Sequence, residues 1–163
     1  MIDDNIVTQK MIELAELIGY EPTDISFLKK AMYCQIIHED GDGKNRKNYT
    51  NDSFATLGDA ILKLILTEFL FDKGYDKAEI TKRKKDIEKN DTLFNLCNKS
   101  GIFNYAYNDK YFSPNAPKQN KVPHSKHDVY IEAIIAAIYK DKGFDYCKKW
   151  VTSFFDKYDI LFL

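Results

Sequence analysis

The spacing of apolar side chains along the chain predicts a protein built mainly from helices. In residues 11–18 and 25–32 apolar side chains recur every three or four positions, as on one face of a helix, and Gly19 and Pro22 separate the two segments. Residues 51–71 form a further predicted helix that is apolar nearly all round after Gly58, which is typical of a central helix surrounded by its neighbours. We therefore expect two short amphipathic helices followed by a long central one.

Four more helices are predicted in the second half of the chain, together with two loops. The helices span residues 77–90, 91–101, from about 124 to 142, and 144–158, with Asp91 as the expected N-terminal cap of the second and Gly101 and Gly143 as the expected stops. The loops span residues 38–50, which are polar and lack an apolar period, and 104–123, which contain three of the four prolines. Glycine and proline are too scarce for many short strands. The expected fold class is therefore all-α, a helical bundle with a long central helix.

The composition fits one compact domain over residues 1–163. Hydrophobic residues make up 44% of the chain, enough to fill a single core, and 24 basic against 25 acidic residues leave a net charge of −1. Any affinity for nucleic acid must then come from local basic segments. The three cysteines suit reduced thiols, and the acidic first residues and interrupted apolar runs predict neither a signal peptide nor a membrane span. We expect a cytoplasmic protein with no membrane partner.

Two pairs of acids stand on the most apolar predicted helices. Asp52 and Asp59 are seven residues apart, two helical turns, and therefore share a face. Asp128 and Glu132 are four residues apart and share a face of the later helix. A carboxylate buried there must be paired, protonated or bound to a metal, and oxygen ligands suit Mg²⁺ or Mn²⁺. The alternative is that the first acid of each pair caps its helix while the second pairs with a lysine.

Residues 51–71, NDSFATLGDAILKLILTEFLF, resemble the signature helix of the ribonuclease III endonuclease domain, with the match strongest from Leu57 to Ala60. Other segments follow the family's order over nearly the whole chain. ELIGYEPTDISFLKKAM is similar to its opening helices, AEITKRKKDIEKNDTLFNLC to its middle helices, and EAIIAAIYKDKGFDYCKKWV to its closing pair. The resemblance implies the helical fold of that domain. Since the chain stops at Leu163, we expect no double-stranded-RNA-binding domain after it.

The resemblance also implies roles for particular acids. Asp59 and Glu132 correspond to carboxylates that coordinate the catalytic Mg²⁺, for which Mn²⁺ can substitute, and Asp128 would assist them as a further ligand. Asp52 stands where the family has an auxiliary catalytic acid. Glu79 occupies the place of another acid near the cleft.

Three positions depart from the family's pattern. Ala55 stands where the signature helix has a glutamate, and Val129 stands where the later helix has its other acid. The Mini-III branch, which is catalytic, resembles this chain at both places. Thr56 replaces an aromatic residue that inserts into the partner subunit. The resemblance thus implies a homodimer whose contact includes Thr56 and Leu57, weakened by the loss of that aromatic ring.

Basic side chains near the acids are expected to contact RNA phosphates, because backbone contacts supply most non-specific affinity. The candidates are Lys82, Arg83 and Lys85 on the charged helix and Lys118, Lys121 and Lys126 on or next to the proline-rich loop. The alternative is a solvated helix face with pairs such as Lys82 and Asp86. Trp150, with Phe154 and Phe155 beside it, is predicted to be core and not a base-stacking surface.

Together these features predict a Mg²⁺-dependent endoribonuclease that cleaves double-stranded or structured RNA and leaves 5′ phosphates. Ala55, Val129 and Thr56 keep a second reading open, namely a catalytically silent ribonuclease III-like module that binds RNA or a protein partner. A plain helical interaction domain is the third alternative.

Overall fold

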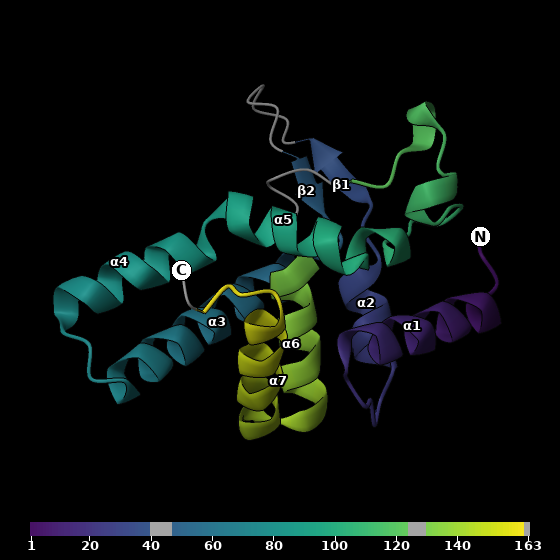
Figure 1. The fold of residues 1–163 in the computed structure, drawn as a ribbon. Coiled ribbons are helices and arrows are strands. Elements are labelled where there is room, and N and C mark those ends of the chain that lie inside the picture. The colour runs from purple at the N-terminus through teal and green to yellow at the C-terminus, as the bar shows by residue number, and fades with distance from the viewer. Residues whose placement is uncertain (40–46, 124–129, 162–163) are drawn as a thin grey trace.

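The computed structural model describes residues 1–39, 47–123 and 130–161, and most of the fold is helical (Figure 1). Two short strands, β1 (Ile36–Glu39) and β2 (Lys47–Tyr49), lie between the second and third helices. The predicted all-α class and the long helix over residues 51–71 are confirmed. The helices are α1 (Asp4–Ile18), α2 (Ser26–Met32), α3 (Asp52–Asp72), α4 (Lys77–Glu88), α5 (Asn90–Ser100), α6 (Tyr130–Lys142) and α7 (Phe144–Lys157).

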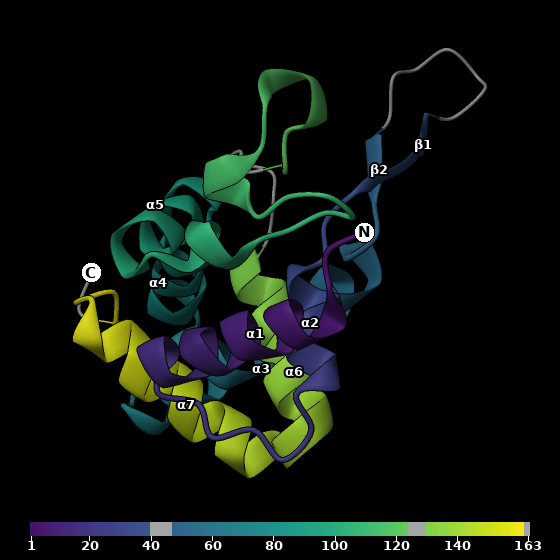
Figure 2. The same ribbon diagram turned by 90° about the vertical axis from the view of Figure 1, so that its right-hand side faces the viewer.

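Helix α6 forms the centre of the fold. All its side chains from Tyr130 to Ile138 are buried, and the helix packs against α2, α3 and α7, most extensively against α3. Figure 1 shows α6 upright in the middle of the molecule with α3 crossing behind it. The side view shows α1 on the outer side of α2 (Figure 2). The two most apolar segments of the sequence therefore meet in the core.

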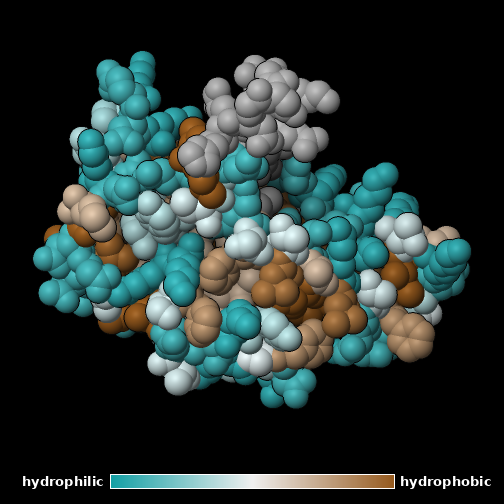
Figure 3. All heavy atoms as spheres, turned by 180° about the vertical axis from the view of Figure 1, so that it is seen from behind, coloured by the Kyte–Doolittle hydropathy of each residue, from teal (hydrophilic) through white to brown (hydrophobic). Residues whose placement is uncertain are grey.

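One face of α3 is not covered by the described part of the chain. Leu57, Leu64 and Phe71 are 38%, 54% and 69% exposed, whereas Leu62 and Leu66 are fully buried. The expectation that neighbours surround this helix is therefore wrong for its outer face. Figure 3 views the molecule from behind and shows a hydrophobic patch over this helix. The apolar residues of α3 thus form two surfaces, one in the core and one facing solvent.

Gly58 allows α3 and α6 to cross at very short range. A Cβ atom at this position would lie 1.6 Å from the carbonyl oxygen of Glu132 and 2.4 Å from its carbonyl carbon. Backbone therefore rests directly on backbone at the crossing, and no other residue fits without separating the helices. This contact fixes the positions of Asp59, the next residue of α3, and of Glu132.

Helix α4 returns alongside α3 in the opposite direction. The chain turns at residues 73–76, where Gly74 has a φ of 87°, and the Asp76 carboxylate accepts a hydrogen bond from the Glu79 N–H (2.9 Å) to cap α4. Ile87 is buried and anchors the far end of the helix. Because the two helices are antiparallel, the last turn of α4 lies beside the half of α3 that contains Asp59 (Figure 1).

Some local predictions are wrong. Residues 38–50, predicted as a loop, contribute to an antiparallel strand pair in which Ile36 lies opposite Tyr49, and residues 40–46 fall outside the described residues. Strands of four and three residues are too short to show a period. Helix α5 begins at Asn90 with Lys89 in the cap position, so Asp91 is not the cap. Both features lie in long polar stretches, where apolar periodicity gives no signal.

The stretch of residues 104–123 is a loop, as predicted, but it is folded back by 3₁₀ turns at Ile102–Tyr105, Ser113–Asn115 and Lys118–Asn120. Asn108, which is buried, accepts hydrogen bonds from the backbone N–H groups of Lys110 and Tyr111 (2.9 and 2.8 Å) and so holds the loop. The predicted helix start near residue 124 lies outside the described residues. In the part of the chain that is described, no helix is both long and apolar enough to cross a membrane.

The helix crossing generates a stability prediction. Gly58→Ala places a methyl group on the Glu132 backbone, and the overpacking should lower the free energy of unfolding by about 2–4 kcal/mol. Urea unfolding followed by circular dichroism measures this loss. Ala60→Ser, on the exposed face of the same helix, is the control and should change stability by less than about 0.5 kcal/mol. Equal stability of Gly58→Ala and wild type would contradict the close crossing.

Candidate active site

Asp59 and Glu132 lie together where α3 crosses α6. Asp59 directly follows Gly58, the residue whose backbone rests on Glu132. Glu132 is 7% exposed, whereas the Asp59 side chain is 38% exposed. The pair therefore consists of one buried carboxyl group and one that faces solvent. The sequence prediction that two helices bring these acids together agrees with this arrangement.

Burial makes Glu132 an unusually weak acid. Loss of hydration, followed by the negative charge of Asp59, raises the pKa of Glu132 to about 7, with Glu88 adding to the shift and Lys63 opposing it. No hydrogen bond reaches its carboxyl group from the described residues. Because the pKa of this carboxyl group is near neutral, a cation bound nearby would shift it to the ionised form.

Lys63 is the cation nearest to this pair. Its ammonium group contacts the Asp59 carboxylate at 2.7 Å, one turn along α3, and this hydrogen bond raises the pKa of Lys63. Lys63 also acts electrostatically on Glu132. The alternative reading that the second acid of each pair meets a lysine is therefore correct for Asp59. It does not hold for Glu132, which forms no ion pair within the described residues.

Glu88, the last residue of α4, is a further acid of this site that the sequence reading missed. One of its carboxylate oxygens, Oε2, is shielded from solvent and has no hydrogen-bond partner in the described structure. Burial raises the pKa of Glu88, while Lys63 and Lys84 lower it. In the sequence, Glu88 belongs to a densely charged helix, and only its place next to the apolar Ile87 set it apart.

The three carboxylates suit a hard divalent cation by the chemistry of their oxygens. The buried, unpartnered oxygen of Glu88 and the unpaired carboxyl of Glu132 are both groups that such an ion would satisfy. Within the described ranges, no three acid, histidine or cysteine side chains converge as a finished metal site. The described side chains therefore do not form a ready metal site, and Lys63 holds Asp59 in an ion pair.

The remaining predicted acids lie elsewhere. Asp52 is the first residue of α3, about 10 Å along the axis from Asp59, and accepts a hydrogen bond from the Tyr49 N–H (2.7 Å). Asn51 holds the cap position, so the capping alternative for Asp52 is wrong. Glu79 pairs with Arg83 (3.0 Å) at the opposite end of α4 from Glu88. Asp128 lies outside the described residues.

The predicted RNA-binding residues fall into two groups. Lys82 and Lys85 are exposed on α4 and line a shallow hollow on that helix. Lys118 and Lys121 line a separate cleft beside β1. Arg83 is engaged with Glu79 and lies over the Tyr75 ring at 4.3 Å from its centroid. Lys126 lies outside the described residues.

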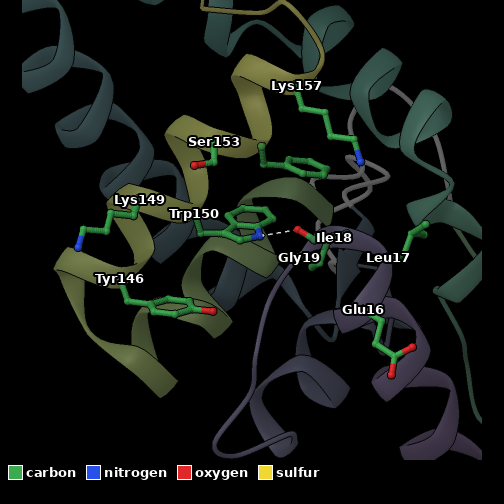
Figure 4. Close-up of a pocket in the computed structure, with 10 residues that line it drawn as sticks. Glu16, Leu17, Ile18, Gly19, Tyr146, Lys149, Trp150, Ser153 and Lys157 are labelled. Atoms are coloured by element: carbon green, nitrogen blue, oxygen red, sulfur yellow. Dashed lines mark hydrogen bonds between the residues drawn. The ribbon is translucent and has the colours of Figure 1, made fainter.

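A groove between the end of α1 and α7 shares no residue with the acidic site (Figure 4). Trp150 forms its floor, stacks on Phe154 at 4.8 Å between ring centroids, and donates a hydrogen bond from Nε1 to the Ile18 carbonyl (2.8 Å). Trp150 is only 5% exposed and Phe155 is fully buried. The prediction that these aromatic residues belong to the core is confirmed.

The pKa of Glu132 generates a pH prediction for the metal-free protein. Between the ordinary pKa of 4.5 and the folded value of about 7 only the folded state keeps the proton, so the stabilisation is complete below pH 4.5 and is lost as pH rises through 7. The loss should be up to about 3 kcal/mol. Urea unfolding in EDTA at pH 5 and pH 8 measures it. Glu132→Gln should show a smaller difference between the two pH values, and parallel behaviour of both proteins would contradict the assignment.

Comparisons with known proteins agree with the arrangement of these helices. The family model of the ribonuclease III domain matches residues 52–143, from the start of α3 to the end of α6. Over 151 residues, 87% of this chain, the sequence is 24% identical to ribonuclease 3 of Caenorhabditis briggsae. Over 109 residues, 66% of this chain, it is 29% identical to ribonuclease 3 of Clostridium botulinum. The matched regions are 13% and 46% of those proteins, so the chain spans less than half of either relative.

Two solved structures of the nuclease domain of ribonuclease III from Campylobacter jejuni share this fold. Both have a TM-score of 0.66, at 23% and 22% sequence identity. They align with 92% and 91% of this chain and with 94% and 95% of their own. The family match includes the helix crossing, Asp59 and Glu132, and it covers more than half of the sequence. The chain belongs to the ribonuclease III domain family.

Proposed function

We propose that this chain is a Mg²⁺-dependent endoribonuclease that cleaves double-stranded or structured RNA. The observation that carries the proposal is the pair formed by Asp59 and Glu132 at the crossing of α3 and α6, with Glu132 buried and its pKa raised to about 7. Carboxyl groups whose pKa is raised by burial and by a neighbouring acid are candidates for functional residues. Asp59 and Glu132 would hold the ion, assisted by Asp128, and Mn²⁺ would substitute for Mg²⁺.

The chemistry required of the protein is modest. Bound Mg²⁺ would activate a water molecule for attack on phosphorus and stabilise the leaving 3′ oxygen, which gives products with 5′ phosphates. With the ion bound, Glu132 would be ionised, and the ammonium group of Lys63 would have to leave Asp59. We propose that Asp52, the first residue of α3 and two turns from Asp59, assists as an auxiliary acid.

We propose that local lysines supply the attraction for RNA. The net charge of −1 gives no general attraction to a polyanion, so local groups such as Lys82 and Lys85 must provide it. We propose that Lys118, Lys121 and Lys126 also contact phosphates. Arg83 would join them only after leaving Glu79.

The second candidate is a catalytically silent module that binds RNA or a protein partner. Its favouring observation is that Lys63 already neutralises Asp59 at 2.7 Å. Ala55, whose position on the α3 face could have carried another acid, is a buried methyl group instead. In this reading the carboxylates remain as a structural cluster.

Cleavage of a long RNA duplex in the presence of Mg²⁺ separates the two candidates. The wild type should cut the duplex, and Glu132→Gln should cut at least 100-fold more slowly because the neutral amide binds the ion poorly. Glu13→Gln on the surface of α1 is the matched control and should cut like wild type. If wild type binds the duplex without cutting it, the silent module is the better account.

We also propose a homodimer that uses the exposed face of α3. One Campylobacter jejuni structure is described as showing flexibility in a region involved in dimer formation. Here Thr56 is exposed on α3 next to Leu57, which belongs to the same exposed apolar face as Leu64. A self-complementary apolar patch is what twofold symmetry requires, and burying it would remove the apolar surface from water.

Light scattering over a concentration series tests the dimer. The mass should rise from 19.0 kDa toward twice that value, and Leu57→Lys should lower the apparent affinity at least 10-fold. Ile6→Lys, which changes an exposed residue of α1, should leave the association unchanged. A mass that stays at 19.0 kDa at high concentration would refute the dimer.

A further inference from the structure

We propose that Glu88 supplies a third carboxylate to the metal site, from a third helix. This inference rests on the proposed function, because it adds a ligand to the site formed by Asp59 and Glu132. It follows from three features of the molecule: an unpartnered oxygen, the arrangement of three helix segments, and the balance of charge among the groups that they carry.

The first feature is the environment of the Glu88 carboxylate. Its Oε2 atom is shielded from water and receives no hydrogen bond, and no other side-chain nitrogen or oxygen in the described ranges shares that condition. Shielding a charged oxygen without a partner costs stability, and a bound ion is one way in which such a group is satisfied. A divalent cation is a partner of the required charge.

The second feature is the position of Glu88 relative to the other acids. The buried side chain of Ile87 anchors the last turn of α4, and the Thr92 hydroxyl donates to the Asp86 carbonyl (2.9 Å) across the junction with α5. The backbone that carries the Glu88 side chain is therefore held in place. Its carboxyl interacts electrostatically with Asp59 on α3 and with Glu132 on α6.

The third feature is a deficit of positive charge. The three carboxyl groups repel one another electrostatically. The cations that act on Glu88 are Lys63 and Lys84. Among the described residues, Lys63 forms its ion pair with Asp59 and not with Glu88. If all three acids are ionised, their three negative charges exceed the two positive charges of Lys63 and Lys84. If an ion displaced Lys63, two of the negative charges would remain for that ion to neutralise.

The same features define the movement that binding needs. Since the described acids do not form a finished three-ligand set, the Glu88 side chain must change rotamer toward Asp59 as Lys63 withdraws. A glutamate has three side-chain torsions for this purpose. The backbone of the site, fixed by the contact between Gly58 and Glu132, does not have to move.

Calorimetric titration of Mn²⁺ into the full chain tests the assignment. Glu88→Gln should weaken Mn²⁺ binding at least 10-fold, because the amide keeps the shape of the side chain and loses its charge. Asp86→Asn removes a carboxylate two residues away, on the opposite face of α4, and should bind Mn²⁺ like wild type. Asp59→Asn should abolish binding at this site.

Thermal unfolding supplies a second readout that a purely structural glutamate would not reproduce. In EDTA, Glu88→Gln should unfold at a higher temperature than wild type, because the unpartnered charge is gone. In excess Mn²⁺ the order should reverse, since ion binding stabilises the wild type more. The same order in both conditions would overturn the assignment.

The two proposals fail in different ways. If Asp59→Asn loses Mn²⁺ binding while Glu88→Gln binds as tightly as wild type, Glu88 is not a ligand and the proposed site stands without it. If the wild-type chain binds no Mn²⁺ at millimolar concentration, the metal site is refuted, and with it both the role of Glu88 and the Mg²⁺-dependent activity.

Discussion

The contact between Gly58 and the backbone of Glu132 is the constraint on which the site depends. A side chain at residue 58 would hold α3 and α6 apart, and Asp59 and Glu132 would separate with them. Beside this crossing, Ala133 and Ala137 of α6 are fully buried and pack in one cluster with Ala31. The absence of a side chain at residue 58 thus keeps the two helices that carry the acids together.

The site combines groups whose surroundings differ sharply. Glu132 is buried and holds its proton up to about neutral pH, whereas Asp59 faces solvent and is paired with Lys63. The repulsion between the two acids is small because burial keeps Glu132 protonated and Lys63 neutralises Asp59. In the metal-free protein, the proton on Glu132 and the ammonium group of Lys63 therefore limit the repulsion among the acids. A divalent cation would replace these two positive charges.

The sequence was sufficient to predict most helices, because periodic apolar side chains at residues 11–18, 25–32 and 51–71 report directly on the faces that pack. It could not reveal that α3 keeps one apolar face exposed, since a buried face and an uncovered face have the same composition. The short strands around Ile36 and Tyr49 also escaped, because three or four residues carry no periodicity.

The candidate site was predictable only in part. Asp59 and Glu132 could be found because isolated acids on apolar helices are costly to bury. Glu88 could not, because its significance comes from the antiparallel return of α4 along α3, which brings residues 25 or more positions apart into one field. In a helix rich in lysine and acid, the neighbouring Ile87 is the only local sign that Glu88 differs from a solvated glutamate.

The hydrogen bond from Trp150 to the Ile18 carbonyl joins segments 132 residues apart. During synthesis, α1 leaves the ribosome long before α7 exists, and at roughly 10 residues per second about thirteen seconds separate the two partners. Throughout that interval the apolar side of α1 that faces α7 has no cover from its native neighbour. The nascent chain therefore passes through a period in which binding by a chaperone, or premature association between chains, competes with correct closure of the domain.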